Sequence, residues 1–193
     1  MTNSSRSGQF PIVAVRAEPS PPPAPAPLAF REVFVLHAGY VWNSMRRLGV
    51  PPSDLEDLTH DVFVEVHRHF ADYDPARPIK PWLFGFAFRV ASQHRRRLRR
   101  RSETSAEPAE VVDPGALPDA RVAADQDRRL VLAALQHVEP GRRAVFVLYE
   151  IDGVPMHDIA TALGIPVNTA YSRLRLARAE FADAVKKLRR GER

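Results

Sequence analysis

The chain has 193 residues, of which 45% are hydrophobic and 26% are charged, and its formal net charge is +5. This length allows one ordinary domain or two small ones, and the hydrophobic fraction is sufficient for buried cores. The sequence lacks an apolar run of the roughly 18 residues that a membrane span needs. The absence of cysteine excludes disulfides, thiolate metal sites and cysteine nucleophiles. We therefore expect a soluble, cytoplasmic protein with a basic surface suited to nucleic acid.

Two segments have the composition of connecting chain. Residues 1–28 contain 7 of the 18 prolines and no apolar period, which predicts an extended or disordered tail. Residues 102–127 are rich in acidic residues and proline, which predicts a flexible acidic linker. The remaining sequence has helical periodicity and no alternating strand pattern. We expect an all-α protein with two small helical domains, at residues 29–101 and 128–193.

The first helix is predicted at residues 28–48 and ends before Gly49 and Pro51. Its candidate core side chains are apolar residues at helical spacing: Phe30, Val33, Phe34, Val41, Trp42 and Met45. Ser53 is expected to open the second helix, with Glu56 completing an S-x-x-E capping box.

The second helix is predicted to have one apolar face and one acidic stripe beside it. The apolar face consists of Leu55, Leu58, Val62 and Val66. The acidic stripe consists of Asp54, Asp57, Asp61 and Glu65.

The third helix is predicted to start near Pro81 and to run into seven arginines between residues 89 and 101. A solvated helix end is one interpretation, since cations suit the negative pole of a helix. Seven arginines repel one another, however, and a polyanion such as DNA compensates this repulsion. Bases could stack on whichever upstream aromatic residues face outward, although most of them should be core: Trp82, Phe84, Phe86 and Phe88.

The second domain contains helix-turn-helix spacing. Residues 156–163 form a short amphipathic segment, Gly164 supplies the sharp turn, and a second helix begins at residue 167. Its apolar stripe is Ala170, Leu174, Ala177, Phe181, Val185 and Leu188. The other side carries Asn168, Thr169, Tyr171, Ser172, Arg173, Arg175 and Arg178. Short hydrogen-bonding side chains with arginine suit the major groove. An ordinary helical hairpin with a solvated outer face is the alternative.

Both halves resemble one family, the extracytoplasmic-function (ECF) sigma factors of bacterial RNA polymerase. Residues 57–63 read D-L-T-H-D-V-F, which is similar to the polymerase-binding motif D-L-x-Q-E-V-F of sigma region 2. Residues 82–87 read W-L-F-G-F-A, close to the W-L-x-x-I-A that opens the promoter-melting helix. Residues 140–178 follow the order of sigma region 4, including S-R-L at residues 172–174. The resemblance covers about 30–101 and 127–188.

The resemblance implies a protein without catalytic residues, metal or cofactor that binds core RNA polymerase and promoter DNA. The polymerase (β′ clamp) would contact Asp54, Asp57, Asp61, Val62, Phe63 and Glu65. The −10 element would contact Lys80, Trp82, Arg89, Ser92, Gln93, Arg96 and Arg97. The −35 element would contact Asn168, Thr169, Tyr171, Ser172, Arg173, Arg175 and Arg178. Further expected partners are the β flap and an anti-sigma factor, and the expected location is the nucleoid.

The sequence departs from the family pattern at three positions. Arg89 and Gln93 stand where Asn and Asp are common, so the preferred −10 bases do not carry over. Leu176 replaces a common arginine, which removes one expected contact to the −35 element.

Two other functions would account for parts of the sequence. A free-standing helix-turn-helix regulator would need only the second domain and would leave residues 57–63 unexplained. In a metalloenzyme, the metal ligands could be His60, His67 and His69 with a nearby aspartate. Their spacing matches no metal motif such as H-E-x-x-H, so solvated histidines are the favoured interpretation.

Overall fold

The computed structural model describes residues 29–104 and 122–191, and every regular element in these two ranges is helical. The predicted tail and most of the predicted linker lie outside them. The main elements are α1 (Phe30–Arg47), α2 (Leu55–Arg68), α3 (Ile79–Thr104), α4 (Val122–Gln136), α5 (Pro140–Phe146), a π-helical turn (Val147–Ile151), α6 (Met156–Leu163) and α7 (Val167–Gly191). Short 3₁₀ turns lie at Pro52–Asp54 and Phe70–Asp72. The all-α prediction is confirmed.

Helices α1, α2 and α3 pack around a shared apolar core, which we call region 2. The predicted apolar face of α2 is buried along its whole length, with Val62 and Val66 fully inaccessible to solvent. In α1, however, the prediction that Phe34 and Trp42 belong to the core is wrong, since they are 43% and 37% exposed. Phe34 lies at the edge of the core, where its ring packs against Phe63 at a centroid distance of 4.7 Å.

The start of α2 differs from the predicted capping box. Residues Pro52–Asp54 form a 3₁₀ turn, and the α-helix begins at Leu55 without a side-chain cap. The Ser53 hydroxyl donates to the Asp54 carboxylate at 2.8 Å instead of accepting a backbone N–H group. The reason is that proline fixes φ and has no N–H, so the chain between Pro51 and Ser53 enters a tight turn first.

Both helices that flank the predicted linker are longer than expected. Helix α3 begins at Ile79 and continues to Thr104, and α4 begins at Val122, before the predicted start at residue 128. The first residues of α4 read Val-Ala-Ala, and alanine has the highest helix propensity.

Helices α4 to α7 form a second unit, which we call region 4. Helix α5 starts at Pro140, where the Glu139 side chain accepts the N–H groups of Gly141 and Arg142 at 3.0 and 2.9 Å. Gly164 ends α6 with φ of 64°, a left-handed conformation that favours glycine, as predicted for the helix-turn-helix. The apolar side of α7 packs on α5, and the Phe146 and Phe181 rings lie 4.7 Å apart.

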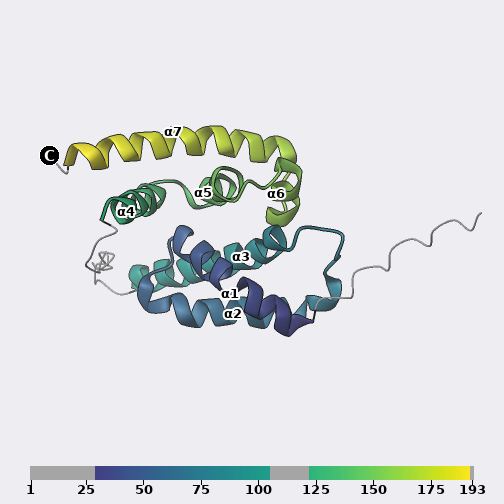
Figure 1. The fold of residues 1–193 in the computed structure, drawn as a ribbon. Helices are drawn as coiled ribbons and strands as arrows, with labels where there is room; N and C mark the ends of the chain where they lie inside the picture. Colours follow the sequence, from purple (N-terminus) through teal and green to yellow (C-terminus); the bar gives the residue numbers. More distant parts are fainter. Residues whose placement is uncertain (1–28, 105–121, 192–193) are drawn as a thin grey trace, which may run out of the picture.

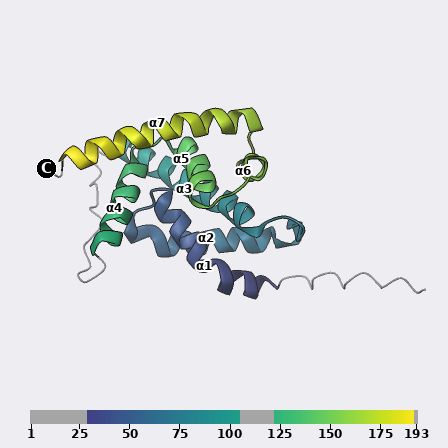
Figure 2. The same cartoon turned by 45° about the horizontal axis from the view of Figure 1, so that its top comes forward.

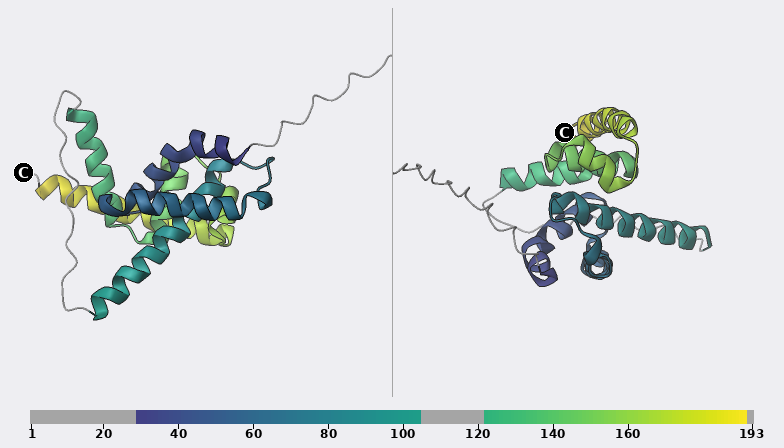
Figure 3. Two further views of the ribbon diagram at one scale, coloured as in Figure 1. Left: turned by 90° about the horizontal axis from the view of Figure 1, so that it is seen from below. Right: turned by 90° about the vertical axis from the view of Figure 1, so that its right-hand side faces the viewer.

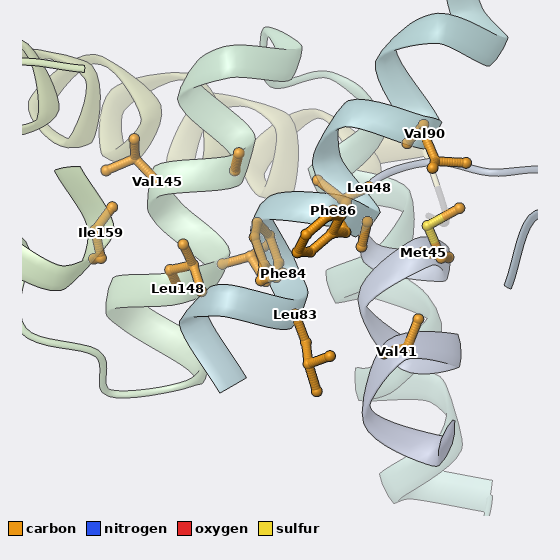
Figure 4. Packing of buried hydrophobic residues seen from close by; sticks show 14 of the residues in the cluster. Val41, Met45, Leu48, Leu83, Phe84, Phe86, Val90, Val145, Leu148 and Ile159 are labelled. Atoms are coloured by element: carbon orange, nitrogen blue, oxygen red, sulfur yellow. The ribbon is translucent and has the colours of Figure 1, made fainter. Parts of the chain in front are cut away.

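Regions 2 and 4 lie against each other as two helical layers, with α4 to α7 above α1 to α3 in Figure 1 and in the right-hand view of Figure 3. Figure 2 shows the same arrangement with region 4 turned toward the viewer. Their buried residues form one continuous cluster. Figure 4 shows Phe84 of α3 pointing toward Leu148 and Ile159 of region 4. Among the described residues, no helix combines the length and apolar character needed to cross a bilayer.

Candidate nucleic-acid and polymerase interfaces

The acidic stripe of α2 is only partly open to a partner. Asp57 and Asp61 are exposed, as the sequence predicts, and no ion pair within the described residues involves either of them. Glu65 pairs with Arg68 at 2.5 Å, and Asp54 lies 2.8 Å from His94 Nε2 of α3. The surface available for a basic partner is therefore centred on Asp57 and Asp61.

Two other residues of this predicted interface are buried. Val62 is inaccessible and Phe63 is 3% exposed, because both point into the core of region 2. In this structure they hold α2 in place and support the surface that Asp57 and Asp61 present.

The basic face of α3 lies beside three aromatic rings that contact one another in sequence. The guanidinium of Arg89 lies 4.3 Å from the centroid of Phe86, whose ring meets Trp82 edge-on at 4.9 Å. Trp82 in turn lies 4.9 Å from Tyr73. These four side chains line a pocket of about 430 Å³. Burial lowers the pKa of Arg89, and the opposing charge of Glu65 limits that effect.

The remaining −10 candidates differ in exposure and in position. Gln93, Arg96 and Arg97 are exposed on α3, as a nucleic-acid surface requires. Ser92 is half-buried and accepts a hydrogen bond from Arg95 at 3.0 Å. Lys80 lies apart from this set, since its ammonium is 5.6 Å from the ring of Tyr40 on α1.

A groove between α2 and α3 joins the acidic and basic surfaces. It has a volume of about 390 Å³, and its lining includes Asp61 and Glu65 from α2 and Arg89, Gln93 and Arg97 from α3. The two predicted interfaces of region 2 are therefore neighbours on adjacent helices.

The outer face of α7 carries the predicted −35 residues. Asn168, Tyr171 and Arg175 are exposed, whereas Thr169 and Arg173 are half-buried. The predicted set of polar side chains is therefore only partly open to solvent.

Two members of the −35 set have partners within the chain. Ser172 is exposed, and its hydroxyl donates to the Asn168 carbonyl at 2.7 Å, so it offers a base only an acceptor. Arg178 pairs with Glu150 of the π-helical turn at 2.6 Å. Arg175 is therefore the clearest candidate for reading a base.

Sequence reasoning missed a buried arginine at the junction of the two regions. Arg143 is 5% exposed, and its guanidinium donates to the carbonyls of Gln136 and Val138 in region 4 and of Leu48 in region 2. Burial, and then the charge of Arg95, lower the pKa of Arg143 to about 10. It is still charged at neutral pH. The five donors of arginine allow carbonyl oxygens to satisfy a buried guanidinium, but nothing in the sequence pattern indicated that this position is buried.

The histidines considered as metal ligands have other neighbours. His69 Nδ1 lies 2.9 Å from the Glu65 carbonyl, and the His67 ring packs edge-on against Phe30 at 4.7 Å. Within the described ranges, no group of three or more histidine, aspartate or glutamate side chains could hold a metal ion.

Comparisons with known proteins agree with this division into two regions. The family model for Sigma-70 region 2 matches residues 33–101, and that for Sigma-70 region 4 matches residues 128–181. The chain is 30% identical to the ECF sigma factor SigL of Mycobacterium tuberculosis, over 76% of this chain and 83% of SigL. It is 29% identical to the sigma factor CnrH of Cupriavidus metallidurans, over 80% of this chain and 85% of CnrH.

Solved structures share the fold. Sigma factor RpoE of Bartonella quintana, in complex with the anti-sigma factor NepR, superposes with a TM-score of 0.65 at 21% identity, covering 81% of this chain and 96% of RpoE. CnrH in complex with the cytosolic domain of CnrY gives 0.57 at 24% identity, covering 82% of this chain and 88% of CnrH.

The chain belongs to the ECF sigma factors of the sigma-70 family. It binds core RNA polymerase and promoter DNA and directs promoter-specific initiation of transcription, without being an enzyme itself. The match to region 2 does not favour the alternative of a stand-alone helix-turn-helix regulator, which would have no use for this domain.

Proposed function

We propose that the chain docks on the β′ clamp of core polymerase through the acidic stripe of α2. Asp57 and Asp61 provide the exposed charge, and Asp54 and Glu65 flank them. Val62 and Phe63 support this surface from the core. A basic partner surface would be steered to the stripe by opposite charge. Region 4 would contact the β flap.

The −10 element would lie along α3. Trp82 and Arg89 line the aromatic pocket, where a base can stack, and Gln93, Arg96 and Arg97 continue the same helix toward its basic end. Ser92 and Lys80 belong to the edge of this surface: the first is bonded to Arg95, and the second lies over Tyr40.

The −35 element would be read by α7 in the major groove. Arg175 is assigned to a base edge, and Asn168, Thr169, Tyr171 and Ser172 to the groove around it. Arg173 and Arg178 are assigned to phosphates at the sides of the helix, where Arg178 would exchange Glu150 for DNA.

The observation that carries this assignment is the separation of charge in region 2. Exposed carboxylates on α2 and exposed arginines on α3 occupy neighbouring helices with a groove between them. One surface suits a basic protein, and the other suits a polyanion, so polymerase and DNA can be bound at the same time.

The test is gel filtration of the purified chain with core polymerase, followed by run-off transcription. We expect co-elution and promoter-dependent transcripts for the parent protein. Asp61→Lys should lose co-elution, whereas Arg96→Ala combined with Arg97→Ala should keep co-elution and lose transcripts. If both variants lose co-elution equally, the division of labour between α2 and α3 is wrong.

We also propose that an anti-sigma factor holds the chain inactive, and that the chain acts in the cytoplasm on the nucleoid. The support for the first is that the similar folds of RpoE and CnrH were solved in complexes with NepR and with CnrY. Co-purification of the tagged chain from its native cells tests both proposals, through the partners and the DNA recovered with it.

A further inference from the structure

Helix α7 lies across α5 and is tied to it by one ion pair on each side (Figure 1). On one side, Arg178 of α7 pairs with Glu150 of the π-helical turn that follows α5, at 2.6 Å. On the other side, Glu180 of α7 pairs with Arg142 in the first turn of α5. Residues 178 and 180 project about 200° apart on a helix with 3.6 residues per turn. The two pairs therefore flank the apolar stripe of α7 from opposite sides.

The Glu180 carboxylate holds the start of α5 with both of its oxygen atoms. Its Oε1 accepts the guanidinium of Arg142, and its Oε2 accepts the backbone N–H group of Glu139 at 3.1 Å. Glu139 is the N-cap of α5, and its own carboxylate accepts the N–H groups of Gly141 and Arg142. One side chain of α7 thus binds both the N-cap residue and the first turn of α5.

A second side chain of α7 reaches the same place. Arg173 lies two helical turns before Glu180 and therefore on the same side of α7. Its Nη1 atom would stand 3.4 Å from a Cβ atom added to Gly141. The side chains of Arg142 and Glu180 are 34% and 29% exposed, so both are partly withdrawn from water. The start of α5 is therefore in contact with α7 along two turns.

The apolar contact between α7 and α5 is poorly suited to fixing how α7 is rotated about its own axis. Three of the four fully buried residues of α7 are alanines: Ala170, Ala177 and Ala184. Apolar burial is non-directional, and methyl groups interlock little with a neighbouring helix. A side chain that reads a base, however, has to be held within about 10–20° of its productive direction. Directional contacts at the two sides of the stripe can supply this precision.

We propose that Arg142 and Glu180 are positioning residues that fix the rotation of α7 on α5 and so aim Arg175 at one base of the −35 element. This inference rests on the proposed role of α7 in reading that element. In the DNA complex proposed above, Arg178 exchanges Glu150 for a phosphate, which releases the pair on one side. The pair of Arg142 with Glu180 then has to hold the rotation of α7 while DNA is bound.

Four variants separate this role from its alternatives. Glu180→Ala and Arg142→Ala remove the two halves of the pair, whereas Arg142→Lys keeps a cation beside the carboxylate. The matched control is Asp183→Ala, because Asp183 pairs with Lys186 within α7, at 3.8 Å. Arg175→Ala serves as the reference for loss of the base contact itself.

The measurement is the affinity of holoenzyme, assembled from core polymerase and each full-length variant, for a promoter and its single-substitution −35 variants. The parent should prefer one base at the position that Arg175 reads. Glu180→Ala and Arg142→Ala should each reduce this preference several-fold. The double variant should lose no more than either single variant, because the two residues act as a pair. Arg142→Lys and Asp183→Ala should retain the preference of the parent.

Three outcomes would overturn the positioning role. An unchanged base preference in Glu180→Ala and Arg142→Ala, with only a lower melting temperature, would mean that the pair merely stabilises the fold. Additive losses in the double variant would mean that the two residues act separately. If Arg142 binds a phosphate directly, Arg142→Ala should weaken binding to all promoter variants equally, and Glu180→Ala should strengthen it.

The reference variant distinguishes failure of the positioning role from failure of the proposed function. An unchanged base preference in Arg175→Ala would overturn the base contact by α7 and the positioning role with it. Loss of the preference in Arg175→Ala, together with its retention in Glu180→Ala, would overturn the positioning role alone.

Discussion

In region 2 the exposed residues assigned to polymerase and to DNA lie on different helices, whereas in region 4 one arginine assigned to DNA is paired with a carboxylate of the chain. Asp57 and Asp61 are exposed on α2, and Arg96 and Arg97 are exposed on α3. In region 4, by contrast, Arg178 of α7 is paired with Glu150. Separated charge favours two simultaneous partners, while paired charge makes DNA compete with a carboxylate of the protein. The two regions should therefore respond differently to charge substitutions.

The largest effect is expected on the acidic side of region 2. Asp61→Lys places a cation where a basic partner surface docks, and like charges in an interface cost several kcal/mol. Folding should change little, because Asp61 is exposed. Affinity for core polymerase, measured by fluorescence anisotropy, should fall by at least about a hundredfold. The control is Asp183→Lys on α7, another exposed acidic residue, and similar losses in both variants would refute the α2 assignment.

The next effect concerns the DNA-reading face of region 4. Arg175→Ala should cost about 1–3 kcal/mol of binding to the −35 element and relax the preference at one base position. Arg178→Ala should weaken binding to all sequences and flatten the dependence on salt by about one unit of slope. The measurement is binding to single-substitution −35 variants. If Arg175→Ala lowers affinity for every variant equally, Arg175 contacts a phosphate instead.

A smaller effect on stability is expected at the start of α5. Glu139→Ala removes a side chain that accepts two backbone N–H groups and should lower the free energy of unfolding by about 1 kcal/mol. Burial raises the pKa of Glu139, but these hydrogen bonds and Arg142 outweigh burial, so the net shift is downward. Because the pKa is lowered in the folded state, this contribution is complete above the ordinary glutamate pKa and is lost as the pH falls below it. The melting temperature of Glu139→Gln should lie below that of the parent at neutral pH and should equal it in acid.

The smallest effect tests the paired charge directly. Glu150→Gln releases Arg178 without removing it, so affinity for duplex DNA should rise by a few tenths of a kcal/mol at low salt, and the gain should disappear at high salt. The double variant Glu150→Gln with Arg178→Ala should show no gain in DNA affinity over Arg178→Ala alone. An equal gain in the double variant would mean that Glu150 repels DNA independently of Arg178.

The elements of both regions were largely predictable because local spacing determines them. The buried face of α2 and the left-handed Gly164 follow from helical periodicity and from the conformational freedom of glycine. The predicted capping box of α2 is absent because the chain forms a 3₁₀ turn at Pro52 before the α-helix begins.

The interface between the regions could not be predicted in the same way. Its contacts join residues far apart in sequence: Arg143 with Leu48, and Asp152 with Arg47. No local pattern records such pairs. The one signal was Gly85, a helix-interior glycine whose reason appears only when α6 is seen against it.

The most direct test of the division between the regions is run-off transcription with core polymerase on a promoter library randomised in both elements. The account predicts that Arg175→Ala changes the recovered bases only in the −35 block. It predicts that Arg89→Ala changes them only in the −10 block, since its guanidinium lies in the aromatic pocket of α3. If both variants change the same block, or neither changes any, the assignment of α3 and α7 to separate promoter elements is contradicted.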